Sequence, residues 1–391
     1  MRPRFAPAAL RRAHRVLSGY VERGEVPGLV SLVAAGDEVH VNVLGDKAFG
    51  GTPMERDSLF RISSMTKPVT AAATMMLVEE CRLRLDDPVD ELLPELADRR
   101  VLRRIDGPLD DTVPADRPIT PRDLLTFRFG FGIVLAPPGS TPIQRAIDEL
   151  GLVIGPPKPV TPHHPDEWLR RLGTLPLLHQ PGERWMYQVG SEVLAVLIAR
   201  ASGMPFERFL AERIFEPLGM SDTGFVVPAG KAPRFTTSYQ VDERTGEFQV
   251  FDAPDGHWSA PVPFPSGGAG LVSTADDYLA FSRMLLAGGA GLLSPRSVAL
   301  LTADHLTAEQ AASGAPLLDD GLGWGFGVAV VNRDGGFATR GRYGWDGGLG
   351  TSWAADPATG LTGILLTQRT DWPMPWHARE DFWTTAQTAL T

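Results

Sequence analysis

The sequence of 391 residues lacks several features that would assign it to a class at once. Cysteine occurs once, as Cys81, which excludes an intrachain disulfide and agrees with a reducing cytoplasm. Lysine and arginine number 37 against 47 acidic residues, and the net charge of −10 gives no basic footprint for nucleic acid. No apolar run approaches the roughly 20 residues that span a bilayer. We therefore expect a cytoplasmic protein with neither a nucleic acid nor a membrane as its partner.

The predicted elements place strands at both ends of the chain and helices in the middle. Residues 1–29 lack the apolar core of a signal peptide and are typical of an amphipathic helix. Gly36-Asp37 then divides two β-branched runs, which predicts a hairpin. The strongest helical pattern lies at 191–220, and another one, after Lys67, contains Cys81, which we expect in the core.

This order predicts an α+β fold in which an antiparallel sheet is flanked by helices and an inserted domain is mostly helical. From about residue 235, short β-like runs alternate with glycine-rich turns. The sheet domain is therefore predicted to be discontinuous, formed by residues 1–70 and 235–391. The helical domain is predicted to cover residues 71–234.

The stretch "SSMTKPVT" sets Ser64 three residues before Lys67, so the two side chains are neighbours on a helix. Pro68 lacks a backbone N–H, which is tolerated only in the first turn, and this places Ser64 at the helix N-terminus. Unpaired N–H groups there favour a developing negative charge. A serine hydroxyl needs a base, and a lysine serves as one only if burial lowers its pKa. The pair alone is a weak signal.

Two further stretches strengthen it: Tyr187 at a loop-to-helix junction and "WDGG" at 345–348, just ahead of a predicted strand. Together with "SSMTKPVT" they resemble the S-x-x-K, Y-x-N and K-T-G elements of the serine β-lactamase and penicillin-binding-protein superfamily. The resemblance is closest to the class C β-lactamase-like branch and, within it, to family VIII carboxylesterases. It covers nearly the whole chain through the supporting stretches "LDDPVDELLPEL", "ITPRDLLT", "IFEPLGMSDTGF" and "PSGGAGLVSTADDY".

The resemblance implies a β-lactamase-like fold with the active site at the interface of the two domains. It implies that Ser64 is the acyl-forming nucleophile, Lys67 its general base, and Tyr187 a group that shares protons with Lys67 and the leaving group. The oxyanion hole would be the backbone N–H groups of Ser64 and Gly348. No metal and no organic cofactor is implied.

Three departures from the family pattern concern the substrate. Val189 stands where the motif has asparagine, and Trp345 replaces the lysine that would grip a carboxylate. The segment usually seen as H-T-S-G is 127–130, Phe-Arg-Phe-Gly. Each change removes polar grip or adds apolar surface, which favours an ester without a free carboxylate. We expect Trp345 to contact substrate, and Phe127 and Phe129 either to line the acyl pocket or to belong to the core.

Other signals are weaker. The nearest approach to the G-x-S-x-G motif of α/β-hydrolases, at 350–354, lacks the final glycine and lies in a strand-like run. "SGGAG" at 266–270 has no phosphate-loop pattern and predicts a tight turn feeding a strand. His163-His164 with Asp166 has no third ligand at motif spacing, which favours a solvated loop.

The sequence thus predicts a serine hydrolase that cleaves small-molecule carboxylic esters through an acyl-enzyme. An acyltransferase using the same acyl-enzyme, a β-lactamase or D-Ala-D-Ala peptidase, and a non-catalytic binding module are the alternatives. The sequence specifies neither the natural substrate nor the oligomeric state.

Overall fold

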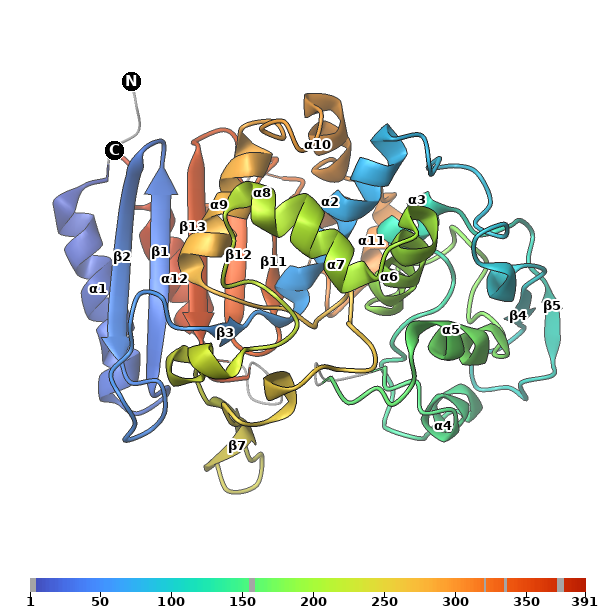
Figure 1. The fold of residues 1–391 in the computed structure, drawn as a ribbon, viewed down its shortest axis with the longest axis horizontal. Coiled ribbons are helices and arrows are strands. Elements are labelled where there is room, and N and C mark those ends of the chain that lie inside the picture. The colour runs from blue at the N-terminus through green and yellow to red at the C-terminus, as the bar shows by residue number, and fades with distance from the viewer. Residues whose placement is uncertain (1–4, 155–158, 320, 334–335, 371–375) are drawn as a thin grey trace.

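A seven-stranded antiparallel sheet organises the computed structural model, which describes residues 5–154, 159–319, 321–333, 336–370 and 376–391 (Figure 1). The strand order is β2-β1-β13-β12-β11-β10-β9, so strands from the two ends of the chain lie side by side. The strands of this sheet are β1 (Gly28–Ala35), β2 (Glu38–Gly45), β9 (Leu322–Trp324), β10 (Ala329–Val331), β11 (Tyr343–Gly347), β12 (Thr351–Asp356) and β13 (Leu361–Thr367).

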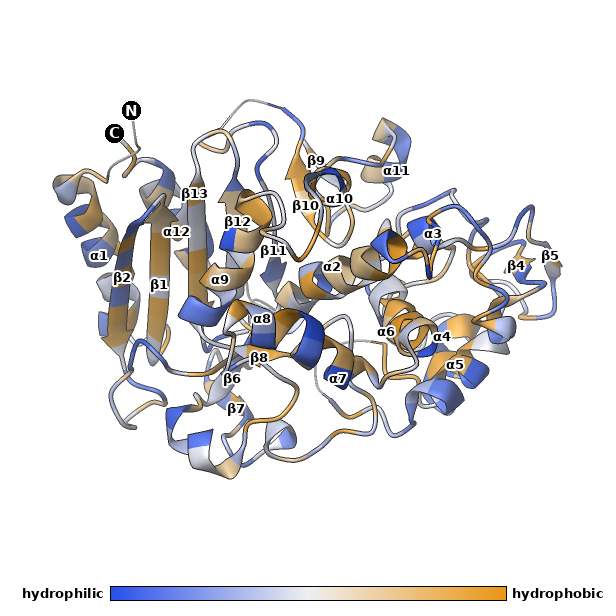
Figure 2. Cartoon of the chain, turned by 45° about the horizontal axis from the view of Figure 1, so that its top comes forward, coloured by the Kyte–Doolittle hydropathy of each residue, from blue (hydrophilic) through white to orange (hydrophobic). Residues whose placement is uncertain are grey.

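Both faces of the sheet are covered, so every residue of β1 is buried. Leu29 and Val33 face the cluster formed with the terminal helices α1 (Pro7–Glu22) and α12 (Ala378–Gln387). Val30 and Leu32 alternate with them and face the main core, to which α2 (Thr66–Glu79) and α9 (Ala275–Leu286) contribute residues. Figure 2 shows the hydrophobic character of β1. The predicted hairpin between β1 and β2 is confirmed, with Gly36 at a φ of 61° in the turn.

The helices between the two groups of strands gather beside the sheet, and α2 lies between the sheet and α3 and α6 (Figures 1 and 2). The helices are α1 (Pro7–Glu22), α2 (Thr66–Glu79), α3 (Pro121–Leu125), α4 (Pro142–Glu149), α5 (Pro165–Gly173), α6 (Val189–Ser202), α7 (Phe206–Leu210), α8 (Glu216–Leu218), α9 (Ala275–Leu286), α10 (Pro295–Leu301), α11 (Ala308–Ala312) and α12 (Ala378–Gln387). Three two-stranded ribbons complete the fold: β3 (Phe60–Arg61) with β8 (Val272–Ser273), β4 (Arg100–Leu102) with β5 (Thr112–Pro114), and β6 (Ser238–Val241) with β7 (Phe248–Asp252).

This architecture confirms the predicted α+β fold with an antiparallel sheet flanked by helices. The domain limits at residues 70 and 235 stay a prediction. In the part of the chain that the structure describes, no single helix has the length and apolarity to cross a membrane, although the bent pair Val189–Ser202 and Phe206–Leu218 reaches that length and composition when taken together.

The prediction for Cys81 was wrong, because α2 ends at Glu79 and the cysteine is exposed. Cys81 adopts a left-handed backbone with a φ of 56°, and its N–H donates to the Val78 carbonyl oxygen at 3.0 Å. This conformation ends a helix, usually at glycine, and turns the side chain out of the apolar stripe. The apolar periodicity extends up to this position, so the sequence pattern did not reveal the helix end.

Candidate active site

The segment before Ser64 is anchored by a buried ion pair. Arg61 in β3 donates to Asp252 Oδ2 from Nε at 2.8 Å and from Nη2 at 2.5 Å, and both side chains are 1% exposed. Arg61 also donates to the Thr236 carbonyl oxygen at 2.6 Å, so its guanidinium is held from several sides. The chain then enters a 3₁₀ turn, Ser63–Met65, in which Ser63 has a φ of 49°. Ser64 therefore stands directly before α2, as predicted from Pro68.

Lys67, in the first turn of α2, is fully buried and its Nζ is 2.9 Å from Ser64 Oγ. Two carbonyl oxygens contact the same nitrogen: Gln188 Oε1 at 2.7 Å and the Gly268 backbone oxygen at 2.7 Å. Gly268 belongs to the predicted tight turn at 266–270, which does feed the short strand β8. The lysine amine therefore has three close neighbours, and only Ser64 among them carries a proton that the amine could take.

Burial lowers the pKa of Lys67 to about 7, because the dry surroundings disfavour the charged amine. The Glu192 carboxylate acts in the opposite direction and raises the pKa of Lys67. Near neutral pH a substantial share of the Lys67 amine is therefore unprotonated, which an exposed lysine would not be. The amine can then accept the Ser64 proton.

Tyr187 lies just before α6, with its ring centroid 4.4 Å from Lys67 Nζ. Its hydroxyl oxygen accepts a hydrogen bond of 2.6 Å from Trp345 Nε1. Burial raises the pKa of Tyr187, and hydrogen bonding with Ser64 and Trp345 opposes part of that rise. The phenol therefore keeps its proton at neutral pH and can act as a donor.

The candidate oxyanion groups lie where β11 packs against the 3₁₀ turn. A Cβ on Gly347 would fall 2.4 Å from the Ile62 carbonyl oxygen, so only glycine permits this close approach. Gly348 is exposed, with open space around it. Within the described residues, no hydrogen bond occupies the N–H of Ser64 or of Gly348. Both donors are available to a ligand oxygen, as an oxyanion hole requires.

The three predicted substrate-binding residues lie in two different places in the structure. Trp345 is half-buried next to Tyr187, with ring centroids 5.6 Å apart. It lies within β11 and ahead of β12, the strand predicted to follow it. Phe127 is buried in the same aromatic cluster, whose other members are Trp185 and Trp324. Phe129, 1% exposed, packs in the main core instead.

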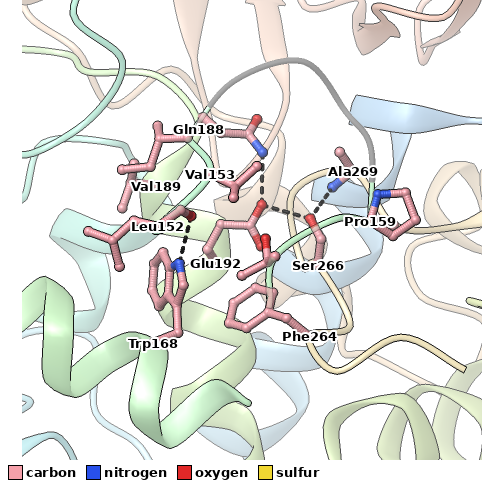
Figure 3. A pocket seen from close by; sticks show the side chains of 13 residues that line it. Leu152, Val153, Pro159, Trp168, Gln188, Val189, Glu192, Phe264, Ser266 and Ala269 are labelled. Atoms are coloured by element: carbon pink, nitrogen blue, oxygen red, sulfur yellow. Dashed lines mark hydrogen bonds between the residues drawn. The ribbon is translucent and has the colours of Figure 1, made fainter. Parts of the chain in front are cut away.

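Three residues of the arrangement were missed by sequence reasoning: Gln188, Glu192 and Gly268. Gln188 has a φ of 82°, and this unusual backbone turns its side chain toward Lys67. Glu192 is buried on α6, where Gln188 Nε2 donates to its Oε1 at 2.8 Å and Ser266 Oγ donates to the same oxygen at 2.7 Å (Figure 3). A lone carboxylate in the apolar run of α6 was a signal that could have found Glu192.

A small cavity of about 30 Å³ adjoins this acid, and neither Ser64 nor Lys67 lines it. Figure 3 shows Glu192 among the side chains that line it, with Leu152, Trp168 and Phe264 as apolar walls. Glu192 Oε2 is buried and has no hydrogen-bond partner among the described residues. No group of three or more His, Cys, Asp or Glu side chains within the described ranges could hold a metal ion.

Comparisons with known proteins agree with the fold. A family model described as Beta-lactamase matches residues 13–387. Protein Rv1367c of Mycobacterium tuberculosis is 40% identical, with 89% of this chain and 87% of that protein covered. Esterase EstB of Burkholderia gladioli is 33% identical over 87% of this chain and 85% of its own length. The solved structure of EstCE1, described as a hydrolase with promiscuous acyltransferase activity, superposes with a TM-score of 0.82 at 26% identity, covering 97% of this chain and 99% of that one.

Proposed function

This chain belongs to the Beta-lactamase family, and from that premise we propose that it is a serine hydrolase that cleaves carboxylic esters through an acyl-enzyme on Ser64. One observation carries the proposal: a fully buried lysine amine lies 2.9 Å from a serine hydroxyl at the start of a helix. The name of the relative esterase EstB supports the same reaction class.

In the proposed acylation, neutral Lys67 takes the proton of Ser64 Oγ while this oxygen bonds to the ester carbonyl carbon. The negative charge on the carbonyl oxygen is stabilised by the N–H groups of Ser64 and Gly348. The bond to the alkoxy oxygen then breaks, and Tyr187 gives the leaving alcohol its proton, which Lys67 replaces. In deacylation, water bonds to the acyl carbon and gives one proton to the Lys67–Tyr187 pair. The bond between the acyl carbon and Ser64 Oγ then breaks, and the pair returns the proton to this oxygen, which releases the acid and the free serine.

The proposed substrates are esters without a free carboxylate. Trp345 occupies the position of the family's lysine, and its indole offers an apolar surface and one N–H, which Tyr187 already takes. Arg128, in the segment 127–130, also carries a positive charge. Its guanidinium donates to Gln310 Oε1 at 3.1 Å and to Thr126 Oγ1 at 3.0 Å, so it already binds groups of the protein itself. These contacts favour a neutral ester over a β-lactam or a peptide carboxylate.

Acyl transfer is the second candidate, because the acyl-enzyme can be released by an alcohol or amine as well as by water. EstCE1, a hydrolase with promiscuous acyltransferase activity, combines both outcomes in one protein. Product analysis in the presence of a competing alcohol separates the two: a transferase forms the new ester in preference to the acid. Turnover of nitrocefin comparable with ester turnover would instead favour a β-lactamase.

The test of the proposal is Ser64→Ala, assayed on short p-nitrophenyl esters and with a fluorophosphonate that labels activated serines. We expect both hydrolysis and labelling to be lost, while Ser63→Ala, which removes the adjacent buried hydroxyl, keeps the labelling. Retention of more than a small residual rate by Ser64→Ala would refute the nucleophile, and absence of labelling in the unmodified protein would refute the hydrolase.

A further inference from the structure

A chain of hydrogen bonds runs from the turn at 266–270 through α6 to the lysine amine. Ser266 and Gln188 both donate to Glu192 Oε1 (Figure 3). Gln188 in turn presents its Oε1 to Lys67 Nζ. The backbone N–H of Gly268 also lowers the pKa of the Glu192 carboxyl group. No hydrogen bond joins Glu192 to Ser64 among the described residues. The hydrogen-bonded connection between Glu192 and Lys67 runs through Gln188.

The number of protons on the neutral Lys67 amine explains why these hydrogen bonds are important for the proposed reaction. A neutral amine has two N–H donors and one lone pair. The Gln188 side-chain oxygen and the Gly268 backbone oxygen, each at 2.7 Å, accept hydrogen bonds and cannot donate them. When both are satisfied, the two N–H bonds are committed, and the lone pair is left for Ser64 Oγ at 2.9 Å.

This arrangement requires the Gln188 amide to keep its oxygen toward Lys67. Reversal of the amide would present two N–H donors to the amine and set the amide oxygen against the Glu192 carboxylate oxygen, where neither has a proton to share. Glu192 Oε1 accepts from Nε2 at 2.8 Å and thereby selects the useful orientation. A charge-assisted hydrogen bond in a dry site makes this selection strong.

The position of the Glu192 carboxylate favours one orientation of the Gln188 amide. All of its hydrogen bonds with side chains go to Oε1, whereas Oε2 lies buried beside the cavity without a partner among the described residues. The groups that can carry charge near Lys67 are Glu192 from α6 and the phenol of Tyr187. Burial keeps Tyr187 neutral. Burial also raises the pKa of Glu192, while the hydrogen bonds from Ser266 and Gln188 and the nearby Lys67 act to lower it. In its charged form, Glu192 opposes the desolvation of the lysine.

We propose that Glu192 is a positioning residue which, through the amide of Gln188, holds the lone pair of Lys67 on the Ser64 hydroxyl. The inference rests on the proposed function, since it assigns Lys67 as the base of Ser64. It goes beyond that function because it identifies a buried acid, outside the reacting groups, as the one that orients this base.

The experiment measures kcat and KM for a p-nitrophenyl ester between pH 5.5 and 9 in Glu192→Gln, Glu192→Leu, Gln188→Ala and the double variant Gln188→Ala/Glu192→Leu. At pH 8.5, where Lys67 is neutral, Glu192→Leu should lower kcat roughly ten-fold with KM unchanged, because an acceptor is lost but no substrate contact. Glu192→Gln keeps an acceptor and should recover most of this loss. It should nevertheless move the ascending limb of kcat/KM to lower pH, because the carboxylate that raises the pKa of Lys67 is gone.

The double variant tests whether Glu192 acts through Gln188: Glu192→Leu should have little further effect once Gln188→Ala is present. Asp277→Asn is the matched control. Asp277 is a buried acid on α9 that accepts from Thr223 Oγ1 at 2.9 Å, and its variant should leave the ascending limb in place. Circular dichroism on each variant shows whether it is folded.

Additive losses in the double variant, or an ascending limb that does not move in Glu192→Gln, would overturn the role of Glu192. In either case the unmodified protein would still hydrolyse the ester and label at Ser64. A failure of the proposed function looks different, because then the unmodified protein itself shows no hydrolysis and no labelling.

Discussion

Replacement of Lys67 by methionine gives the sharpest prediction, because stability then reports the charge of the amine without any substrate. An unfolded lysine has a pKa of about 10.4, whereas burial lowers the pKa of Lys67 in the folded protein to about 7. Between these two values the unfolded chain binds one proton that the folded chain does not. Stability must therefore rise with pH, by about 1.4 kcal/mol per pH unit.

The magnitude follows from the two pKa values. At pH 7.5 binding of this proton stabilises the unfolded state by about 4 kcal/mol, and at pH 9.5 by only about 1 kcal/mol. The free energy of unfolding of the unmodified protein, relative to Lys67→Met, should thus increase by about 2–3 kcal/mol over this range. The comparison cancels the titrating groups that both proteins contain, apart from Glu192, whose pKa the charge of Lys67 lowers.

The assay is equilibrium urea unfolding of both proteins at pH 7.5, 8.5 and 9.5, analysed by linear extrapolation. Methionine approximates the length of the lysine stem and cannot titrate, and the absolute difference between the two proteins at one pH is not needed. Two stability curves that stay parallel across the range would mean that the folded protein keeps Lys67 protonated. Lys67 could then not be the base of Ser64.

The other expected results concern the pH dependence of hydrolysis, the contact between Tyr187 and Trp345, and the buried ion pair. In hydrolysis assays kcat/KM should rise with pH around a midpoint near 7, as Lys67 loses its proton, and Tyr187→Phe should lower the plateau by about 10² to 10⁴ without shifting that midpoint. Trp345→Phe, which removes the N–H donor to Tyr187, should reduce kcat about ten-fold. Trp345→Lys should raise the rate on acidic esters relative to the rate on neutral esters. If this ratio of rates stays the same as in the unmodified protein, Trp345 does not contact the substrate. Asp252→Ala should destabilise the fold by about 3–5 kcal/mol in urea unfolding, because Arg61 is left as an unpaired buried cation.

The sequence predicted the elements whose signals are local. The Ser64–Lys67 pair needs only three residues of helix, and the position of Pro68 located the helix start. The hairpin at Gly36 was likewise predicted from two adjacent residues, Gly36 and Asp37, and from the β-branched runs on either side of them. Helix ends were harder: Cys81 in a left-handed conformation leaves no trace in the apolar periodicity.

Burial against partners distant in sequence could not be predicted in the same way. Phe127 and Phe129 are two residues apart and equally buried, yet one packs beside Tyr187 and the other in the main core. The difference arises from the path of the chain, because Phe127 has a φ of 57° and turns toward Trp324, with ring centroids 5.0 Å apart. No feature of the pattern Phe-Arg-Phe distinguishes these two environments.

The change from asparagine to Val189 illustrates how a departure from a motif can be only partly interpreted from sequence. Asparagine has both an amide for the substrate and an oxygen that a lysine can use, and valine supplies neither. In this structure the residue one position earlier, Gln188, supplies the oxygen to Lys67, and its φ of 82° is what brings it there. The Gln188 nitrogen donates to Glu192, so this amide is committed to groups of the protein itself. The proposed base is therefore retained while the amide grip on a β-lactam side chain is lost, which is the combination that the proposed ester hydrolase requires.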